Sequence, residues 1–219
     1  MLSSRLVIKL VRHGQSKANT QEIDPQFVGD FRTSLTPLGE EQAREAGRQI
    51  GPDFFDRSLV YVSPYERAKQ TLHGIMEVAT ENQALGIYED PRLREVDHGY
   101  SDVKEQESLR ERHGWFYYRY KGGESPADCY DRISGFLESL MREVERKEAE
   151  RVLIVTHGLA LRCFVMRFLH LTVGEFEKME NPENGDIITI ARRAAFVEPP
   201  SLEKGSWAVS GLKWLPVSV

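Results

Sequence analysis

The chain has 219 residues, enough for one large domain with a continuous hydrophobic core. Hydrophobic residues make up 40% and charged residues 29%, as is ordinary for a soluble protein, and no apolar run approaches the length of a membrane span. The formal net charge of −5 argues against nucleic-acid binding by the whole surface. Because Arg5 and Lys9 interrupt the first apolar stretch, it does not resemble a signal peptide, and we expect a cytoplasmic protein without membrane or nucleic-acid partners.

The first predicted strand covers residues 6–11, an apolar run that ends at the triplet Arg12-His13-Gly14. The triplet places a cation, an imidazole and a flexible backbone at one point of the chain. Thr36 then has the position of a helix cap before Pro37, and Gly51-Pro52 is expected to end this helix.

The second predicted strand covers residues 59–62, which are all apolar, as is typical of a sheet with helices on both faces. Ser63 is expected to cap the next helix, with Glu66 completing a capping box. Arg67 lies in the first turn of that helix, where a cation opposes the helix dipole at a cost of roughly 0.3–1 kcal/mol. An anion near Arg67 would remove that cost.

Residues 100–123 are dense in charged and aromatic side chains, and we expect them to leave the sheet as a helical lid. Ser125-Pro126 begins the following helix by the same device as Thr36-Pro37. The two cysteines, Cys129 and Cys163, have neither metal-binding nor redox spacing, so we expect two buried, reduced thiols in helices.

The apolar run 152–155 is the third predicted strand, and it ends at His157-Gly158 before another helix. Residues 187–190 and 194–197 are expected to pair as late strands. From about residue 199 the pattern assigns no structure, and we expect a C-terminal tail.

Strands that alternate with helices predict a mostly parallel sheet, in which ligands bind beyond the carboxyl ends of the strands. Three of these ends carry cations or imidazoles, and four side chains are expected to meet there: Arg12, His13, Arg67 and His157. A phosphoryl group, with its three equatorial oxygens, would satisfy such a set of donors.

Five motifs, in this order, resemble those of the histidine phosphatase superfamily, which includes the cofactor-dependent phosphoglycerate mutases. They are residues 10–19 (LVRHGQSKAN), 63–71 (SPYERAKQT), 93–99 (LREVDHG), 123–125 (GES) and 155–158 (VTHG). The resemblance implies a phosphoglycerate mutase-like fold, which is α/β, three-layer α/β/α with a mostly parallel central sheet. It also implies a single domain over residues 1–219, with a lid insertion at about 100–123 and a tail from about 199.

The resemblance implies a role for each site residue. His13 is the nucleophile that takes the phosphoryl group as a phosphohistidine, and Glu95 protonates the leaving oxygen and later activates water. The phosphoryl oxygens are held by Arg12, Arg67 and His157. Asn19 helps to position the substrate or His13. No metal or other cofactor is expected, because the adjacent arginines would repel a cation.

Taken alone, each motif has a structural alternative. Arg12-His13-Gly14 could be a plain turn, and His157 could be a buried histidine bonded to a backbone carbonyl. Arg67 could form an ion pair with Glu66 or a neighbouring carboxylate. The order of the five motifs favours the catalytic interpretation over these alternatives.

The side of the site that faces the substrate is less determined. Glu95 competes with Asp97 as the acid, and the position in the motif favours Glu95. Residues 115–120 are typical of lid packing, although Arg119 among them could reach a substrate anion. His98 is close enough to Glu95 in the sequence to approach the site.

The superfamily contains phosphatases, mutases and members without catalysis. Residues 100–123 lack the longer, basic insertion of the mutases, and Gly99-Tyr100-Ser101-Asp102 replaces the Trp-Glu-Gly of many phosphatases. We therefore expect a metal-independent histidine acid-type phosphatase that hydrolyses phosphomonoesters of a small metabolite or a phosphoprotein. The alternatives are a cofactor-dependent phosphoglycerate mutase and a non-catalytic module that binds phosphate ligands. The substrate and the oligomeric state, a homodimer included, stay open.

Overall fold

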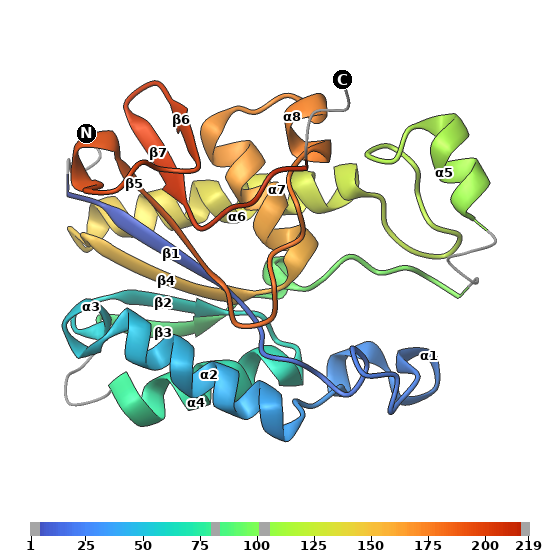
Figure 1. Cartoon of the computed structure of the whole chain (residues 1–219), viewed down its shortest axis with the longest axis horizontal. Coiled ribbons are helices and arrows are strands. Elements are labelled where there is room, and N and C mark those ends of the chain that lie inside the picture. Colours follow the sequence, from blue (N-terminus) through green and yellow to red (C-terminus); the bar gives the residue numbers. More distant parts are fainter. Residues whose placement is uncertain (1–4, 80–83, 101–105, 216–219) are drawn as a thin grey trace.

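The computed structural model describes residues 5–79, 84–100 and 106–215. Its elements form three layers, with one sheet between two layers of helices (Figure 1). The seven strands have the order β3-β2-β4-β1-β5-β7-β6. Parallel pairing joins β3 (Gly86–Glu89), β2 (Leu59–Val62), β4 (Arg151–Thr156) and β1 (Val7–Arg12). Antiparallel pairing adds β5 (Ile187–Arg192), β7 (Trp207–Ser210) and β6 (Leu202–Lys204). The predicted three-layer α/β/α fold with a mostly parallel core is confirmed.

Two layers of helices cover the sheet (Figure 1). One contains α2 (Pro37–Ile50), α3 (Pro52–Phe55) and α4 (Glu66–Ala79), and the other contains α6 (Pro126–Arg146) and α7 (Gly158–Leu169). Shorter helices are α1 (Pro25–Val28), α5 (Glu107–His113) and α8 (Val173–Glu177), and 3-10 turns cover Asp30–Arg32, Pro91–Leu93 and Arg193–Ala195. Within the described residues, no helix combines the length and apolar composition needed to cross a membrane.

The apolar composition of β4 explains why helices cover both faces of the sheet. Leu153 and Val155 belong to the core under α2 and α4, whereas Val152 and Ile154 belong to the core under α6 and α7. Successive side chains of a strand point to opposite faces, so an entirely apolar strand is stable only when both faces are covered.

The carboxyl ends of β1, β2 and β4 lie at the same level. Arg12 pairs with Thr156 across β1 and β4, and Val62 pairs with Val155 across β2 and β4. The segments that follow these strands therefore leave the sheet side by side, toward the right in Figure 1. Helix α5 lies on the same side of the molecule.

Two of the three predicted helix caps are confirmed. Thr36 and Ser125 cap α2 and α6, each accepting a hydrogen bond from the backbone N–H three residues on. The predicted capping box of Ser63 and Glu66 is wrong, because α4 begins only at Glu66 and the Ser63 hydroxyl lies 2.7 Å from His157 Nε2. The Ser63 hydroxyl therefore bonds with His157, at the end of the neighbouring strand β4, and does not cap the helix.

The C-terminal part also differs from the expectation. Residues 194–197 do not pair with β5, because residues 193–195 form a 3-10 turn and β7 takes that place in the sheet. The segment after residue 199, expected as a tail, contains β6 and β7. Gly205, with φ at +61°, lies in the tight turn between these two strands. Cys129 and Cys163 are buried, free thiols in α6 and α7, as predicted.

Candidate active site

His13 directly follows β1 and is only 4% exposed. Its Nδ1 lies 2.7 Å from the Gly14 carbonyl oxygen, and its Nε2 lies 3.2 Å from Arg67 Nε. A carbonyl oxygen only accepts and a guanidinium N–H only donates, so the ring proton is on Nδ1 and the Nε2 lone pair accepts the hydrogen bond from Arg67. The structure thus places an accepting imidazole nitrogen at the strand end.

The protonation state of His13 follows from its surroundings. Burial lowers the pKa of His13 well below its ordinary value of 6.5, and the positive charges of Arg67 and Arg12 act in the same direction. The Gly14 carbonyl opposes this effect without cancelling it. His13 is therefore neutral near pH 7.

The loop after His13 packs against the start of α2 through two glycines. A Cβ on Gly14 would lie 2.2 Å from the Gly39 carbonyl oxygen, and a Cβ on Gly39 would lie 2.1 Å from that of Gln15. The Gly14 N–H donates to Thr71 Oγ1 at 3.0 Å. Glycine at these two positions lets the backbones approach closely enough to fix the loop that carries His13.

Arg67, in the first turn of α4, is 5% exposed and is held by Asp30. Its Nη1 donates to Asp30 Oδ1 and to the Asp30 carbonyl, both at 2.8 Å, and its Nη2 donates to Oδ2 at 3.1 Å. The Asp30 carboxylate is thus the anion expected near this helix start. Glu66, which the sequence analysis named as a possible partner of Arg67, pairs with Lys69 instead.

His157 follows β4 and is fully buried. Its Nε2 bonds with the Ser63 hydroxyl rather than with a backbone carbonyl, and its Nδ1 has no hydrogen-bond partner among the described residues. The ring centroids of His157 and His13 are 5.0 Å apart. Burial lowers the pKa of His157 well below 6.5, and the charge of Arg67 lowers it further.

Arg12, the last residue of β1, is partly buried beside these histidines. Its Nη1 donates to the Pro182 carbonyl, whereas its Nε is buried without a partner among the described residues. Burial lowers the pKa of Arg12, and the charge of Glu95 raises it in opposition. Arg12 Nε and His157 Nδ1 are therefore two buried polar atoms of this site without a hydrogen-bond partner in the described part of the chain.

Glu95, and not Asp97, lies at this edge of the sheet. Its carboxylate accepts hydrogen bonds from the N–H groups of Leu159 at 3.2 Å and Ala160 at 3.3 Å, at the start of α7. A helix N-terminus favours a carboxylate at this position. The exposed Asp97 instead accepts a bond from the Gly99 N–H at 2.8 Å, within its own turn.

Asn19 stabilises the loop behind His13. Its Oδ1 accepts from the Ser16 N–H and hydroxyl, both at 3.0 Å, and from Asn184 Nδ2 at 3.3 Å. Asn184 Nδ2 also lies 3.0 Å from the His13 carbonyl oxygen, to which it donates. Sequence reasoning missed Asn184, because Asn184-Gly185 has the ordinary pattern of a turn.

Other residues considered from the sequence make contacts outside this set. His98 is exposed and packs against Tyr120, with ring centroids 4.7 Å apart. Arg119 is exposed and forms an ion pair with Asp128. Asp30 and Ser63 are functional candidates that the sequence analysis did not identify, since a loop aspartate and a serine after a strand have many other uses.

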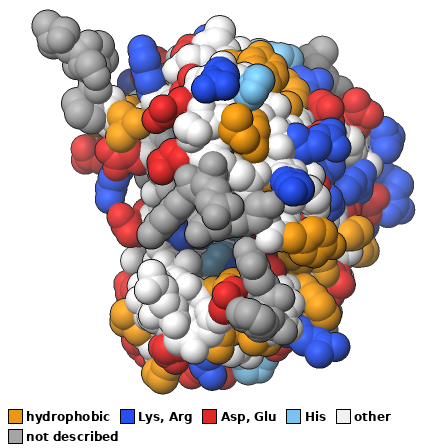
Figure 2. Space-filling model, turned by 90° about the vertical axis from the view of Figure 1, so that its right-hand side faces the viewer, with side chains coloured by type: hydrophobic (Ala, Val, Ile, Leu, Met, Phe, Trp, Pro, Cys, Tyr) orange, Lys and Arg blue, Asp and Glu red, His pale blue; other side chains and the backbone are white. Residues whose placement is uncertain are grey.

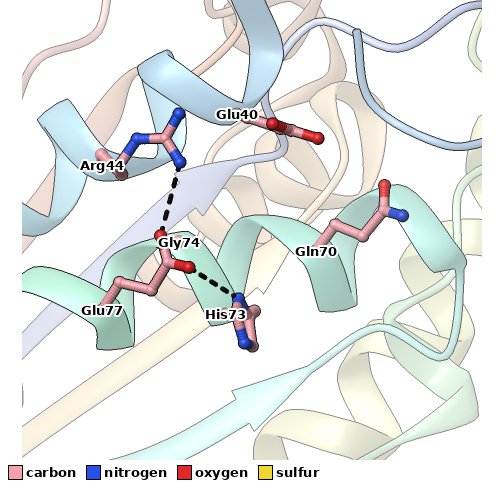
Figure 3. A pocket seen from close by; sticks show the side chains of 6 residues that line it. All are labelled: Glu40, Arg44, Gln70, His73, Gly74 and Glu77. Atoms are coloured by element: carbon pink, nitrogen blue, oxygen red, sulfur yellow. Dashed lines mark hydrogen bonds and ion pairs between the residues drawn. The ribbon is translucent and has the colours of Figure 1, made fainter. Parts of the chain in front are cut away.

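The face onto which the strand ends point is hollowed. Figure 2 shows a recess there, with histidine and Lys or Arg side chains visible inside it. A separate hollow of about 240 Å³ lies between α2 and α4, where Glu77 contacts Arg44 and His73 (Figure 3). That hollow contains none of the predicted site residues. Over the described ranges, no group of three His, Cys, Asp or Glu side chains is arranged to hold a metal ion.

Comparisons with known proteins agree with this fold and these motifs. The sequence profile of the histidine phosphatase superfamily (branch 1) matches residues 8–195. Phosphoglycerate mutase-like protein AT74 of Arabidopsis thaliana is 36% identical over 207 residues, which cover 85% of this chain and 64% of the relative. This chain therefore spans less than two thirds of that protein's length. The broad-range acid phosphatase DET1 of Saccharomyces cerevisiae is 27% identical, with 85% of each chain covered.

A solved structure shares the fold. The mycobacterial glucosyl-3-phosphoglycerate phosphatase, determined with VO3, has a TM-score of 0.69 and 22% identity, covering 86% of this chain and 94% of that one. At this level of identity the likeness concerns the fold, whereas the profile match covers most of the sequence. On that match, the chain belongs to the histidine phosphatase superfamily, branch 1.

Proposed function

We propose that the chain is a phosphomonoester hydrolase that transfers a phosphoryl group to His13 Nε2 and then to water. The observation that carries this proposal is the state of His13. The imidazole is buried and neutral, with its proton directed to the Gly14 carbonyl and its lone pair directed to Arg67. A neutral imidazole nitrogen with an available lone pair is the nucleophile that phosphohistidine formation requires.

In the first step, Nε2 attacks phosphorus, a P–N bond forms and the P–O bond to the leaving group breaks. Asp30 accepts hydrogen bonds from both Nη atoms of Arg67. The Arg67 Nε–H, which donates to His13 Nε2, can therefore exchange that acceptor for a phosphoryl oxygen. When substrate binds, Arg67 would donate its hydrogen bond to the phosphoryl group, and the lone pair of His13 Nε2 would become available for attack.

The other donors of the site fit the remaining phosphoryl oxygens. The Tyr65 N–H lies 3.4 Å from Ser63 Oγ, to which it donates, so the hydroxyl proton is free to donate to His157 Nε2. A neutral His157 then carries its proton on Nδ1, the atom without a partner. Arg12 Nε is the second buried donor that has no partner among the residues described, and an oxyanion would accept hydrogen bonds from both donors.

Glu95 would move the protons. Glu95 enters the cycle as the carboxylic acid, gives its proton to the leaving oxygen in the first step, and as the carboxylate takes one from the water that attacks the phosphohistidine in the second. The P–N bond then breaks and neutral His13 is restored. These residues complete the cycle without a metal ion, and Asn19 contributes by holding the loop behind His13.

We propose substrates among small phosphorylated metabolites or phosphoproteins, and a single domain over residues 1–219 with a lid at about 100–123, of which residues 101–105 lie outside the described part of the chain. Two relatives are named phosphatases, an acid phosphatase and a glucosyl-3-phosphoglycerate phosphatase. The relative named phosphoglycerate mutase-like keeps the mutase as the second candidate.

The test is hydrolysis of a generic aryl phosphate in the presence of a chelator. His13→Ala removes the nucleophile, so we expect turnover to fall by at least about 1,000-fold. His73→Ala is the matched control, because this histidine lies on α4 with its side chain 77% exposed. The measurement includes trapping of acid-labile phosphate on the protein after rapid quenching.

Three results would contradict the proposal. Equal rates for wild type and His13→Ala would exclude the nucleophile. Interconversion of phosphoglycerates that depends on a bisphosphate primer would identify a mutase. Binding of an aryl phosphate without turnover by wild type would identify a binding module.

A further inference from the structure

The motif Gly123-Glu124-Ser125 has no role in the chemistry proposed above, although it contacts the segment that carries Glu95. The Glu124 N–H donates to the Asp97 carbonyl at 2.8 Å. A Cβ on Gly123 would lie 2.2 Å from that same carbonyl oxygen, so only glycine allows the two backbones to approach. Ser125 caps α6, the helix on which Arg132 lies about two turns further on.

Arg132 connects this motif to residues 92–94. Its side chain is 10% exposed, and its Nη1 donates to the carbonyl oxygens of Arg92 at 2.7 Å and Arg94 at 2.8 Å. Its Nε and Nη2 donate to the two carboxylate oxygens of Glu124, at 3.2 and 3.1 Å. One planar guanidinium thus binds two backbone carbonyls and one carboxylate, a combination that requires the arginine fork.

Further contacts hold the backbone on either side of Glu95. Thr156 Oγ1 donates to the Leu93 carbonyl at 2.7 Å, so three successive carbonyls before Glu95 are held. The Asp97 N–H lies 3.4 Å from Glu124 Oε2, to which it donates. The backbone is therefore fixed on both sides of Glu95, and the carboxylate is directed to the start of α7.

We infer that Arg132 and Glu124 are positioning residues for the proposed proton donor, acting through the backbone of residues 92–97 and not on the phosphoryl group. This inference rests on the proposed function of Glu95. On this inference the Gly123-Glu124-Ser125 motif helps to position Glu95, the proposed proton donor, whereas the residues at the strand ends bind the phosphoryl group.

The inference is tested by the dependence of kcat/KM on the leaving group. Phenolate needs a proton as it departs, whereas dinitrophenolate departs without one. In Arg132→Lys the charge stays but the fork is lost, so we expect kcat/KM for phenyl phosphate to fall by about 100-fold. For dinitrophenyl phosphate we expect a loss of less than about threefold, since the acid contributes little to that substrate.

The ratio of the two kcat/KM values does not depend on the fraction of folded enzyme, so partial misfolding of the variant does not mimic the effect. Glu124→Gln, which keeps the size of the side chain, should change the ratio in the same direction. Arg142→Lys is the matched control, because Arg142 is an exposed arginine on the same helix and should leave the ratio unchanged.

A double variant separates positioning from a general structural role. Glu95→Gln should produce the same dependence on the leaving group, and adding Arg132→Lys to it should cause no further loss on phenyl phosphate. An equal loss on both substrates in Arg132→Lys, or additive losses in the double variant, would overturn the inference while leaving the proposed hydrolysis intact. If wild type hydrolyses neither substrate, the proposed function fails, and the inference fails with it.

Discussion

The two sides of the candidate site are built in different ways. On the strand-end side, His13, Ser63 and His157 each directly follow the last residue of a strand. On the Glu95 side, residues 92–97 run from the end of a 3-10 turn into an irregular segment. One side continues the sheet, and the other is an irregular segment held by contacts from neighbouring elements.

The source of rigidity differs accordingly. Backbone hydrogen bonds of the sheet extend into the strand-end side, from the His13 N–H to Thr156 at 2.9 Å and from the Ser63 N–H to Val155 at 3.0 Å. Residues 92–97 are held mainly by side chains instead. We therefore expect substitutions on the strand-end side to weaken transfer from every substrate. On the Glu95 side, they should lower kcat/KM, which reports the transfer to His13, only for substrates whose leaving group needs a proton.

The largest effect is expected for Arg67→Met. This change removes the guanidinium that contacts His13 and is proposed to bind the transferred group, so kcat/KM should fall by about 1,000-fold. The loss should be the same for phenyl and dinitrophenyl phosphates, because both transfer the same phosphoryl group. The measurement is kcat/KM on both substrates.

The exposed Lys69 lies two residues after Arg67 on α4 and provides the control for Arg67. Lys69→Met should retain wild-type kcat/KM on both substrates. A loss in Arg67→Met that is confined to phenyl phosphate would show that the two sides do not divide the chemistry as described.

A smaller uniform effect is expected for Ser63→Ala. The change leaves the buried His157 Nε2 without its partner, at a cost of about 1–3 kcal/mol, which corresponds to a loss of about 5- to 160-fold in kcat/KM if it is expressed in the transition state. Ser134→Ala, at a part-buried serine of α6 outside the site, is the control for loss of a hydroxyl. A change in the phenyl to dinitrophenyl ratio would place Ser63 with the Glu95 side.

The same difference explains what could be predicted from the sequence. Arg12, His13 and His157 come at or directly after apolar runs, and parallel strands bring such positions to one edge, so their proximity followed from the strand pattern. Arg67 followed from its place in the first turn of the next helix. The fold and the strand-end side were predictable because both depend on periodic, local patterns.

The supporting contacts were not predictable in this way. Asp30 lies 37 residues from Arg67, and Asn184 lies 171 residues from His13, in segments without periodicity. Ser63 was assigned to a helix cap because a serine before a helix has the same pattern whether its hydroxyl meets the helix or a side chain 94 residues away. Arg132 is one of several arginines on α6, and only its buried contacts distinguish it.

The last prediction concerns stability, and it follows from the two buried histidines of the strand-end side. His13 and His157 are buried with pKa values well below 6.5, so the folded chain does not take up the protons that the unfolded chain binds as the pH falls below that value. Protons bound only by the unfolded state lower the free energy of unfolding. Stability is therefore full above about pH 6.5 and falls as the pH drops, by up to about 1.4 kcal/mol per pH unit for each histidine.

Urea unfolding of wild type and His157→Asn between about pH 7 and pH 5 measures this effect. The variant should show a slope of unfolding free energy against pH that is smaller by up to about 1.4 kcal/mol per pH unit, whatever its stability at neutral pH. His73→Asn, with an exposed side chain on α4, should keep the wild-type slope. The difference in slope cancels the packing cost of the substitution, so it isolates the buried imidazole. An unchanged slope in His157→Asn would show that this histidine takes up its proton in the folded chain, and that the strand-end side is more open to water than the structure indicates.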